Sequence, residues 1–419
     1  MEKVIYVFAD WLENKEAQLM GTLYADVVRG KEIFSFEYDA LWLQSNTSRI
    51  LDPELRFFSG RQHNAAEEKT NFGLFLDSSP DRWGRVLMQR RESIKARQMK
   101  KENKRLYESD YLLGVHDQTR MGALRFKTTD IDGDFLDNNN NQPTPPITKI
   151  RELENASLAF EKGLQQDDPS LAKWLNILIT PGSSLGGARP KVNVLDTDNS
   201  LWIAKFPSVN DQFDIGLWEF LTYQLALDAG VKMAQSKVRK FNSNNHTFLT
   251  QRFDRRREGS RIHFASAMTL LGNTDGDDYT SGVSYLDIVE FIIQYGASVK
   301  EDLEELFRRI VFSICVKNTD DHLRNHGFLL TDKGWILSPA YDINPNPYGM
   351  GLKLNISDTD NSLSLDLVQE QAEYFRLKAE EAHFIIDRVK RSVQKWRNRA
   401  TTLKISSIEQ ESMSPAFDL

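Results

Sequence analysis

The first part of the chain carries apolar residues in the pattern of strands. The segments VIYVFADW, AQLMGTLYAD and EIFSFEYDALWL, at residues 4–11, 17–26 and 32–43, are dense in β-branched and aromatic side chains. The segment SSPDRWGRVLMQRRESIKARQ, residues 78–98, begins like a helix, with capping residues and a proline in the first turn. We predict an α+β module over residues 1–136, followed by a linker at 137–149, where Asn and Pro accumulate in DNNNNQPTPPITK.

Strands with one helix come next. PKVNVL and SLWIAKFP flank the turn DTDN and predict a hairpin, and HTFLTQRFDR predicts another strand. Between them, residues 214–230 place apolar side chains at helical spacing, with Asp214 as the expected cap and Gly230 as the stop. We assign residues 150–255 to the nucleotide-binding part of a small lobe.

Helical patterns dominate the rest of the chain. They are YLDIVEFIIQYG, KEDLEELFRRIVFSICVKN and the long segment QEQAEYFRLKAEEAHFIIDRVKRSVQKWRNRA at residues 369–400. Residues 256–419 are therefore predicted to form a helical lobe, which gives an α+β, two-lobed fold with an extra N-terminal module.

Charge and composition limit the possible functions. The net charge of −7 argues against nucleic-acid binding by the chain's own electrostatics. A single cysteine, Cys315, cannot form an internal disulfide and favours a reducing compartment. The N-terminal residues lack the basic end and the apolar run of a secretory signal, and no apolar stretch approaches the roughly 20 residues that span a bilayer. We expect a cytoplasmic protein.

The most specific chemical signal is NTDDHLRNHGF, residues 318–328, directly after the apolar run IVFSICV. Phosphoryl transfer needs a carboxylate that accepts or orients the hydroxyl proton, and oxygen ligands for Mg²⁺. Asp320 fits the first role, and Asn325, five residues later, fits the second at the spacing of the protein-kinase catalytic loop. His322 is expected to brace this loop by hydrogen bonding, next to the nucleotide, rather than to act as the base.

A second metal ligand is expected from the following segment. GFLLT and WILSP are strand-like around the turn DKG, so the chain should fold back and bring Asp342 beside Asn325. The other reading of Asp342 is a helix or turn cap.

Candidate phosphate-binding residues lie earlier. Gly186 and Gly187 in SSLGGARPK would let backbone N–H groups approach an anion, although an unliganded surface turn has the same composition. Lys205, in the second strand of the hairpin, would pair with the α- and β-phosphates, or else face solvent. Glu219 could orient it, or lie on a solvated face.

Two other site types fit poorly. His322 and His326 stand at i and i+4, but the HExxH pattern and CxxC pairs of zinc sites are missing. A Ser-His-Asp hydrolase would need the GxSxG elbow, which the sequence lacks.

The motifs SSLGGARPK, WIAKFPS, QRFDR, NTDDHLRNHGF and LSPAYDINP, in this order, resemble the HipA family of serine/threonine kinases, the toxins of type II toxin-antitoxin modules. The resemblance implies a protein-kinase-like fold, ATP and Mg²⁺ as cofactors, Asp320 as catalytic base and Asn325 and Asp342 as magnesium ligands. It further implies that Lys205 contacts the nucleotide phosphates, and that Gln251, through its backbone, and the ring of Phe253 contact adenine.

The resemblance also implies regulation and partners. Ser184, with Ser183 as the alternative, matches the serine that family members phosphorylate on themselves as an off switch. The expected substrate is an aminoacyl-tRNA synthetase such as glutamyl-tRNA synthetase, whose modification halts translation and produces growth arrest and persistence. The expected partner is a HipB-like helix-turn-helix antitoxin, which would make most of the DNA contacts.

Two other functions remain open from the sequence. A small-molecule kinase of the aminoglycoside-phosphotransferase type would use a similar set of Asp, Asn and Asp. A catalytically silent chain could instead serve as a co-repressor of its antitoxin. The paired serines of the glycine-rich segment and the N-terminal module favour a protein acceptor.

Overall fold

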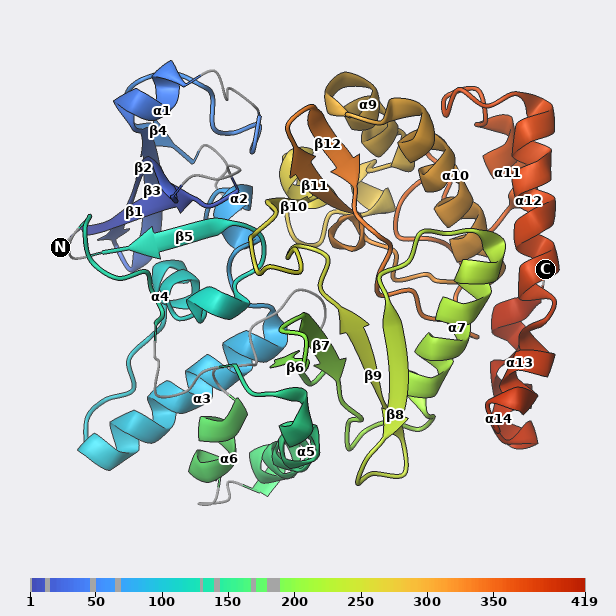
Figure 1. The fold of residues 1–419 in the computed structure, drawn as a ribbon, viewed down its shortest axis with the longest axis horizontal. Coiled ribbons are helices and arrows are strands. Elements are labelled where there is room, and N and C mark those ends of the chain that lie inside the picture. The colour runs from blue at the N-terminus through green and yellow to red at the C-terminus, as the bar shows by residue number, and fades with distance from the viewer. Residues whose placement is uncertain are drawn as a thin grey trace. The chain divides into compact units, whose positions relative to one another are not determined.

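The computed structural model describes residues 2–11, 16–45, 50–64, 69–128, 131–138, 144–166, 171–178 and 189–418 (Figure 1). Contacts divide the chain into two compact units. Unit 1 comprises residues 1–210, 241–243 and 251–265, and unit 2 comprises residues 211–240, 244–250 and 266–419.

Unit 1 contains a five-stranded antiparallel sheet in the order β4-β3-β2-β1-β5. Its strands are β1 Lys3–Ala9, β2 Gln18–Val28, β3 Lys31–Tyr38, β4 Gln62–His63 and β5 Leu124–Lys127. The three strands predicted from the sequence are present, but the third prediction was too long. Asp39 accepts hydrogen bonds from Leu41 N and Trp42 N and so starts the short helix α1, Ala40–Gln44, where we had expected more strand.

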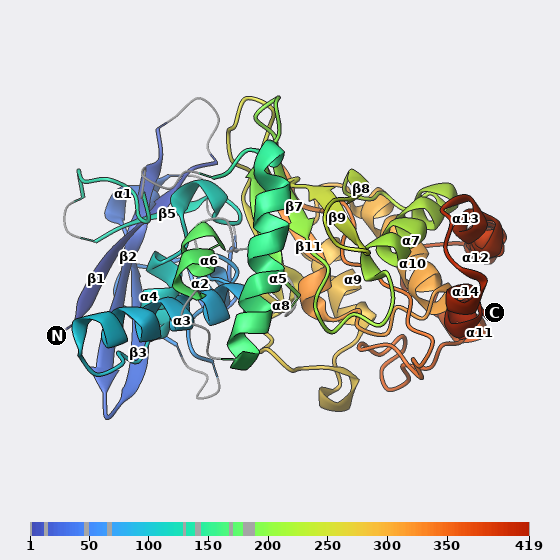
Figure 2. The same ribbon diagram turned by 90° about the horizontal axis from the view of Figure 1, so that it is seen from below.

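The helices of unit 1 are α2 Gly73–Leu76, α3 Arg82–Met99, α4 Glu108–Leu113, α5 Ile150–Gln166 and α6 Leu171–Leu178, with 3₁₀ turns η1 Asp117–Thr119 and η2 Ile147–Lys149. The predicted helix after SSPD is α3; its cap is Asp81, so Pro80 precedes the helix instead of lying in its first turn. Helix α6 packs against α5 and also contacts α3 (Figure 2). The predicted hairpin is formed by β6 Lys191–Leu195 and β7 Leu201–Lys205.

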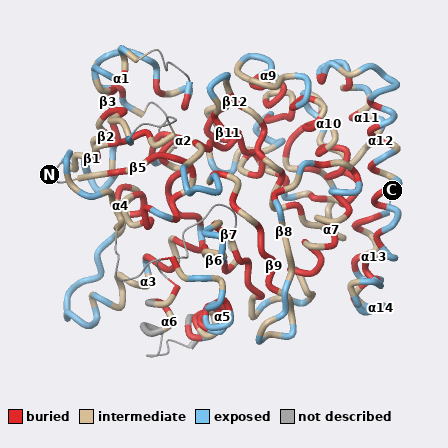
Figure 3. The backbone as a smooth tube through the Cα atoms, in the orientation of Figure 1, coloured by how far each residue is buried: buried red, intermediate tan, exposed pale blue. Residues whose placement is uncertain are grey.

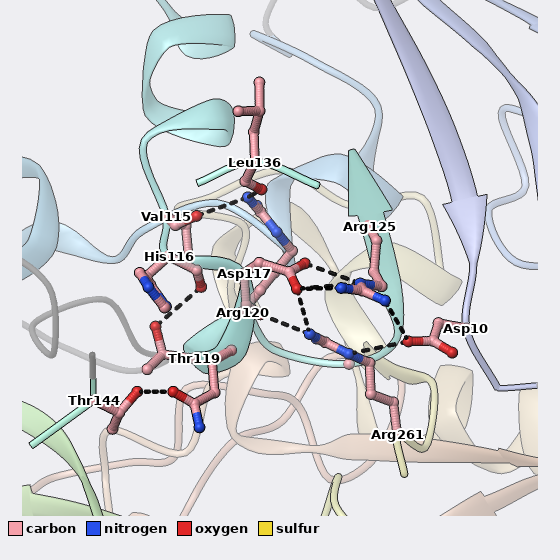
Figure 4. Close-up of polar contacts among 12 residues, drawn as sticks. Asp10, Val115, His116, Asp117, Thr119, Arg120, Arg125, Leu136, Thr144 and Arg261 are labelled. Carbon is pink, nitrogen blue, oxygen red and sulfur yellow. Dashed lines mark hydrogen bonds and ion pairs between the residues drawn. The ribbon is translucent and has the colours of Figure 1, made fainter. Parts of the chain in front are cut away.

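A buried arginine organises the loops at the edge of the unit 1 sheet. Arg120 is fully buried, and its guanidinium donates to four backbone carbonyls, those of Ser78, Leu112, Val115 and Leu136. Burial lowers the pKa of Arg120 to about 9. Figure 4 shows two of these bonds and a neighbouring cluster of Asp10, Asp117, Arg125 and Arg261.

A second buried ionic cluster fixes the segment that follows β9. Asp254 is fully buried; it accepts hydrogen bonds from the guanidinium groups of Arg252 and Arg255 and from Gly122 N at 2.8 Å. Arg252, 4% exposed, also donates to the carbonyls of Thr119 and Arg120. Burial by itself would raise the pKa of Asp254, but the two arginines hold it below its usual value.

Unit 2 is mostly helical. Its longer helices are α7 Ile215–Ala229, α9 Tyr285–Tyr295, α10 Val299–Cys315 and α12 Ala379–Val393, and its shorter ones are α8 Ala267–Leu270, α11 Leu365–Glu370, α13 Trp396–Thr402 and α14 Ser407–Met413. Helix α12 packs against both α7 and α10 (Figure 1). The remaining 3₁₀ turns are η3 Tyr279–Ser281, η4 Leu323–Asn325 and η5 Ser414–Phe417.

Strands of unit 2 form two hairpins. One consists of β8 Ser236–Lys240 and β9 His246–Gln251, whose last residue belongs to unit 1, and the other of β11 Gly327–Thr331 and β12 Gly334–Leu337. The short strand β10, Phe264–Ser266, lies at the boundary between the units in the sequence.

Most predicted helices of unit 2 are confirmed, with one correction. Helix α7 begins after Asp214 and ends at Gly230, which has a left-handed φ of 89°. The segment at 369–400, which we predicted as helical throughout, is interrupted by the left-handed Arg376 between α11 and α12 and again before α13. None of the helices in the described part of the chain has the length and apolar character that crossing a bilayer requires.

We expect Asp254→Ala to destabilise unit 1 by about 3–5 kcal/mol, because it leaves two largely buried arginines without their carboxylate. Since the pKa of Asp254 is lower in the folded chain than in the unfolded chain, its stabilisation is fully present above the unfolded value of 3.8, decreases below that value, and is lost completely as the pH falls through the folded pKa. The destabilisation should therefore shrink towards acidic pH. Urea unfolding at pH 7 and at about pH 3 measures this, with the exposed Glu258→Ala as the control. Equal stability of Asp254→Ala and Glu258→Ala at pH 7 would contradict the assignment.

Candidate active site

The candidate catalytic loop begins where helix α10 ends. Lys317 adopts a left-handed φ of 47°, its N–H donates to Ile314 O at 3.1 Å, and Asn318 N donates to Ser313 O at 2.8 Å. This pair of bonds is the Schellman arrangement, which satisfies the last carbonyls of a helix and turns the chain sharply. The polar segment can therefore follow directly after a buried helix, because the last carbonyls of that helix are hydrogen-bonded.

The loop itself is a tight turn closed by its own hydrogen bonds. His322 N donates to Asp320 O at 2.9 Å, and Asn325 N donates to His322 O at 2.8 Å. The side-chain amide of Asn325 also donates to Asp320 O, at 3.0 Å. Asp320 and Asn325 are therefore held together by the backbone of the turn, and the carboxylate of Asp320 is exposed to solvent.

The neighbouring aspartate, Asp321, is buried and holds the loop in place. Asp321 is 4% exposed; it accepts hydrogen bonds from Tyr285 OH at 2.7 Å and Ser313 Oγ at 3.3 Å, and His326 Nε2 lies 3.1 Å from its carboxylate. Burial alone would raise the pKa of Asp321, but the charge of His326 and the hydrogen bonds to the carboxylate hold it below its usual value. The buried carboxylate of Asp321 can stay charged because its hydrogen-bonding neighbours favour the charged form.

His322, from which we expected bracing, makes no such contact through its ring Nδ1, which is buried without a hydrogen-bond partner in the described chain. The histidine that lies against Asp321 is His326.

A hairpin follows the loop, as predicted from the sequence. Strands β11 and β12 pair from Phe328↔Leu337 to Thr331↔Gly334. After β12 the chain is fixed twice: Ser338 N donates to Gly327 O at 2.9 Å, and the buried Arg309 on α10 donates to Ser338 O at 2.8 Å. The strand after the turn therefore runs back to the catalytic loop.

Hydrogen bonds on both sides of Asp342 connect it to the loop. Tyr341 OH donates to Arg324 O at 2.6 Å, and Asn344 N donates to Asn318 Oδ1 at 3.1 Å. Asp342 has a left-handed φ of 57°, a conformation that Asp tolerates better than most residues, and its carboxylate accepts a hydrogen bond from Asn344 Nδ2 at 3.0 Å. The chain thus brings Asp342 to the loop that carries Asp320 and Asn325.

The donor set suits a hard divalent cation such as Mg²⁺. Asn325 is 7% exposed, and its side-chain oxygen is buried without a hydrogen-bond partner among the described residues. Such an orphaned oxygen costs free energy unless it has another ligand. With the carboxylate of Asp342 it offers two oxygen ligands, the kind that Mg²⁺ takes from protein while substrate phosphates and water complete its shell. No cluster of three or more His, Cys, Asp or Glu side chains suited to a metal ion occurs in the described ranges.

Apart from His322, the predicted nucleotide-binding residues belong to unit 1. Lys205 ends β7 and is 9% exposed, so it does not stand on a solvated strand face. Gln251 ends β9, and the ring of Phe253 lies 6.0 Å from that of Phe264. Glu219, on α7 in unit 2, is likewise buried instead of solvated. Ser183, Ser184, Gly186 and Gly187 lie outside the described residues.

Three residues that fix these segments of the two units were not singled out from the sequence. Asp321 and Asn318 lie inside the motif that we identified, but the local sequence does not distinguish a buried aspartate from an exposed one next to it. Arg252 lies in the quoted QRFDR motif, and its i, i+2 spacing with Asp254 was the available signal.

Comparison with known proteins gives matches over the region of these motifs. Residues 183–396, more than half of the chain, match the family described as HipA-like C-terminal domain. Two curated relatives are both named as putative kinases. One, from Haemophilus influenzae, is 27% identical over 40% of this chain and 54% of its own length. The other, from Sinorhizobium fredii, is 30% identical over 35% of this chain and 36% of its own length. The chain therefore spans about half or less of these relatives.

A solved structure matches nearly the whole chain. It is HipA of Shewanella oneidensis, in a complex of the toxin-antitoxin system with HipB and operator DNA. The TM-score is 0.64 at 17% identity, over 98% of this chain and 94% of the other. At this identity the likeness concerns the fold, and it confirms the predicted fold class. Together with the family match, which includes both the catalytic loop and Asp342, it shows that the chain belongs to the HipA family.

Proposed function

We propose that this chain is a kinase that transfers the γ-phosphate of ATP to a serine or threonine of a protein. The observation that carries the proposal is the buried side-chain oxygen of Asn325, which has no hydrogen-bond partner among the described residues and lies on a loop to which hydrogen bonds connect the segment of Asp342. These two residues would hold Mg²⁺, and Lys205 would contact the nucleotide phosphates, with the backbone at Gln251 and the ring of Phe253 at the adenine. The names of the two curated relatives support a phosphotransferase.

Asp320 would orient the acceptor hydroxyl and take its proton. Its carboxylate is exposed, so an acceptor can reach it, whereas the carboxylate of Asp321 is buried by Tyr285 and Ser313. Bound Mg²⁺ would supply the positive charge that stabilises the phosphates during transfer. The chain itself would position the reacting groups, which is the main protein contribution to this chemistry.

A surface beside Asp320 favours a protein acceptor over a small molecule. Asn346 Nδ2 donates to Thr319 Oγ1 at 2.7 Å, and a Cβ at Gly349 would lie 2.3 Å from the Thr319 side chain, so this segment packs closely on the residue before Asp320. From the same segment Tyr348 is 78% exposed and Met350 is 91% exposed. Large apolar side chains held in water next to a reactive group are typical of a docking surface for another protein.

The finer parts of the proposal follow from the family. The acceptor would be an aminoacyl-tRNA synthetase such as glutamyl-tRNA synthetase, so that activity inhibits translation and leads to growth arrest and persistence in the cytoplasm. Autophosphorylation of Ser184 would switch the kinase off by placing negative charge near the ATP phosphates. A HipB-like antitoxin would neutralise the chain and make most of the contacts to operator DNA; the HipB and DNA in the complex of the Shewanella protein support this part.

Either Asp320→Asn or Asp342→Asn should lower the rate of phosphate transfer by about 100-fold or more, because each removes a carboxylate that the reaction needs. Transfer of labelled phosphate from ATP to protein, with and without added Mg²⁺, measures the effect. Asp332→Asn, an equal change in the exposed turn of the β11–β12 hairpin, should keep full activity. Full activity of either test variant would reject the mechanism, and growth arrest that persists in Asp320→Asn would point to a co-repressor function.

Replacing both Tyr348 and Met350 by alanine should lower protein phosphorylation about tenfold or more by raising KM for the acceptor. The rate of ATP hydrolysis without acceptor should stay within about twofold, because neither side chain has a role at the nucleotide. Labelled phosphate entering the proteins of a cell extract, compared with ATP hydrolysis by the same preparation, separates the two effects. Ile408→Ala, an exposed apolar residue on α14, serves as the control. Unchanged protein phosphorylation, or transfer to an aminoglycoside, would favour a small acceptor.

A further inference from the structure

Positive charge is concentrated in one segment of this acidic chain. Residues 82–105, RWGRVLMQRRESIKARQMKKENKR, contain ten Lys and Arg residues and only two Glu residues, whereas the whole chain has a net charge of −7. The segment consists of helix α3 and the residues that follow it, within unit 1. A local excess of this size creates a positive surface that the total charge conceals.

The second half of α3 does not contribute to the core. Its buried residues are Trp83, Gly84, Leu87 and Met88, and none occurs after Met88. Figure 3 shows the far end of α3 in the colour of exposed residues. The residues after Met88 are half-buried or exposed, so this stretch gains less from packing than the first half of α3, and its like charges repel each other. The stability of unit 1 therefore does not explain the cations in the second half of α3.

Internal ion pairs neutralise only part of this charge. Glu92 lies 3.6 Å from Arg91 and 3.2 Å from Lys95, and Lys104 lies 3.2 Å from Asp110. Arg90, Lys100 and Lys101 have no carboxylate partner in the described part of the chain. Cations in the last turn of a helix are favoured by its dipole, but this effect does not extend to Arg90 or to residues 104 and 105, which lie outside that turn.

A cavity lies between α3 and the chain that follows it. Its volume is about 450 Å³, and its lining includes Arg90, Lys104, Arg105, Gln89, Ser93 and Asn103. Three of these side chains are cations, the other three carry amide or hydroxyl groups, and no carboxylate belongs to the lining. Two hydrogen bonds fix side chains in the wall of the cavity. Gln89 Nε2 donates to Tyr111 OH at 2.7 Å, and Asn103 Nδ2 donates to Ser93 Oγ at 3.1 Å. Cations and polar donors around a hollow without acids suit a phosphate group.

We propose that this surface, residues 89–105 with the cavity, binds the sugar–phosphate backbone of a polynucleotide and seats one phosphate between Arg90, Lys104 and Arg105. The part of α3 beyond Met88 offers half-buried and exposed cations along about 15 Å, which is enough to meet several phosphates. A membrane is a poorer partner, because Met99 is the one large apolar side chain of this segment that is prominently exposed, and membrane-surface helices need an apolar face. The inference is independent of the kinase mechanism.

Binding of the full-length chain to a fluorescent 20-base-pair duplex at several salt concentrations tests the inference, with DNA and RNA duplexes as separate arms. The test variant carries Arg90→Gln, Lys104→Gln and Arg105→Gln. Its affinity should fall about tenfold or more at low salt, and the slope of log K against log salt should decrease in size by about 2–3, because each lost phosphate contact removes roughly 0.9. Binding of either duplex supports the proposal, and the stronger arm identifies the kind of nucleic acid.

The matched control removes the same charge elsewhere, with Lys31→Gln, Lys162→Gln and Lys333→Gln at exposed positions. It should bind within about twofold of the native chain. Equal losses in the two triple variants would overturn the proposal, as would the absence of duplex binding by the native chain. Equally tight binding of polyglutamate, or tighter binding of vesicles with anionic lipid, would also overturn it, in favour of an acidic protein or a membrane.

Discussion

The carboxylate of Asp321, buried at the end of α10, is the constraint on which the candidate active site depends. An ionised group in the interior is tolerated only when its neighbours compensate for the lost water. Here Tyr285, Ser313 and His326 do so, and they come from α9, α10 and the end of the catalytic loop. Because one carboxylate connects these elements, it holds the loop against α9 and α10, and Asp320 is left facing solvent.

A series of polar contacts also connects the catalytic loop to the segment of Asp342, the second proposed metal ligand. Ser313 bonds Asp321 and accepts from Asn318 Nδ2, and Asn318 in turn accepts from Asn344 N, two residues after Asp342. The metal carboxylate that we propose is thus coupled to the buried end of α10 through side chains that do not react. Precise placement of this kind is what phosphoryl transfer demands of a protein, since most of its contribution is positioning.

Charge in this family member is used in two different ways. In the interior of unit 1, arginines are paired: Arg252 and Arg255 with Asp254, and Arg125 and Arg261 with Asp117. On α3 and the residues after it, cations outnumber acids and are half-buried or exposed. Several of them also have carboxylate partners, such as Arg85 with Glu108 and Lys104 with Asp110, but the excess of cations over acids leaves positive charge available for a partner. An overall net charge of −7 is compatible with both.

The sequence by itself determined most of the element types and the hairpin between Asn325 and Asp342, and it supplied the candidate residues for the proposed chemistry. These follow from local causes: apolar periodicity, caps such as Asp214, stops such as Gly230, and the spacing of Asp320 and Asn325. Errors arose where a local cap or a left-handed residue altered the path, at Asp39 and Arg376. Only the tertiary structure decided that Asp321 is buried and Asp320 exposed, that His326 lies against the buried carboxylate, and that the side-chain oxygen of Asn325 has no hydrogen-bond partner among the described residues. Whether a side chain is buried, and which partner it bonds, depends on residues far apart in the chain, such as Tyr285 and Asp321. The local sequence therefore does not predict either property.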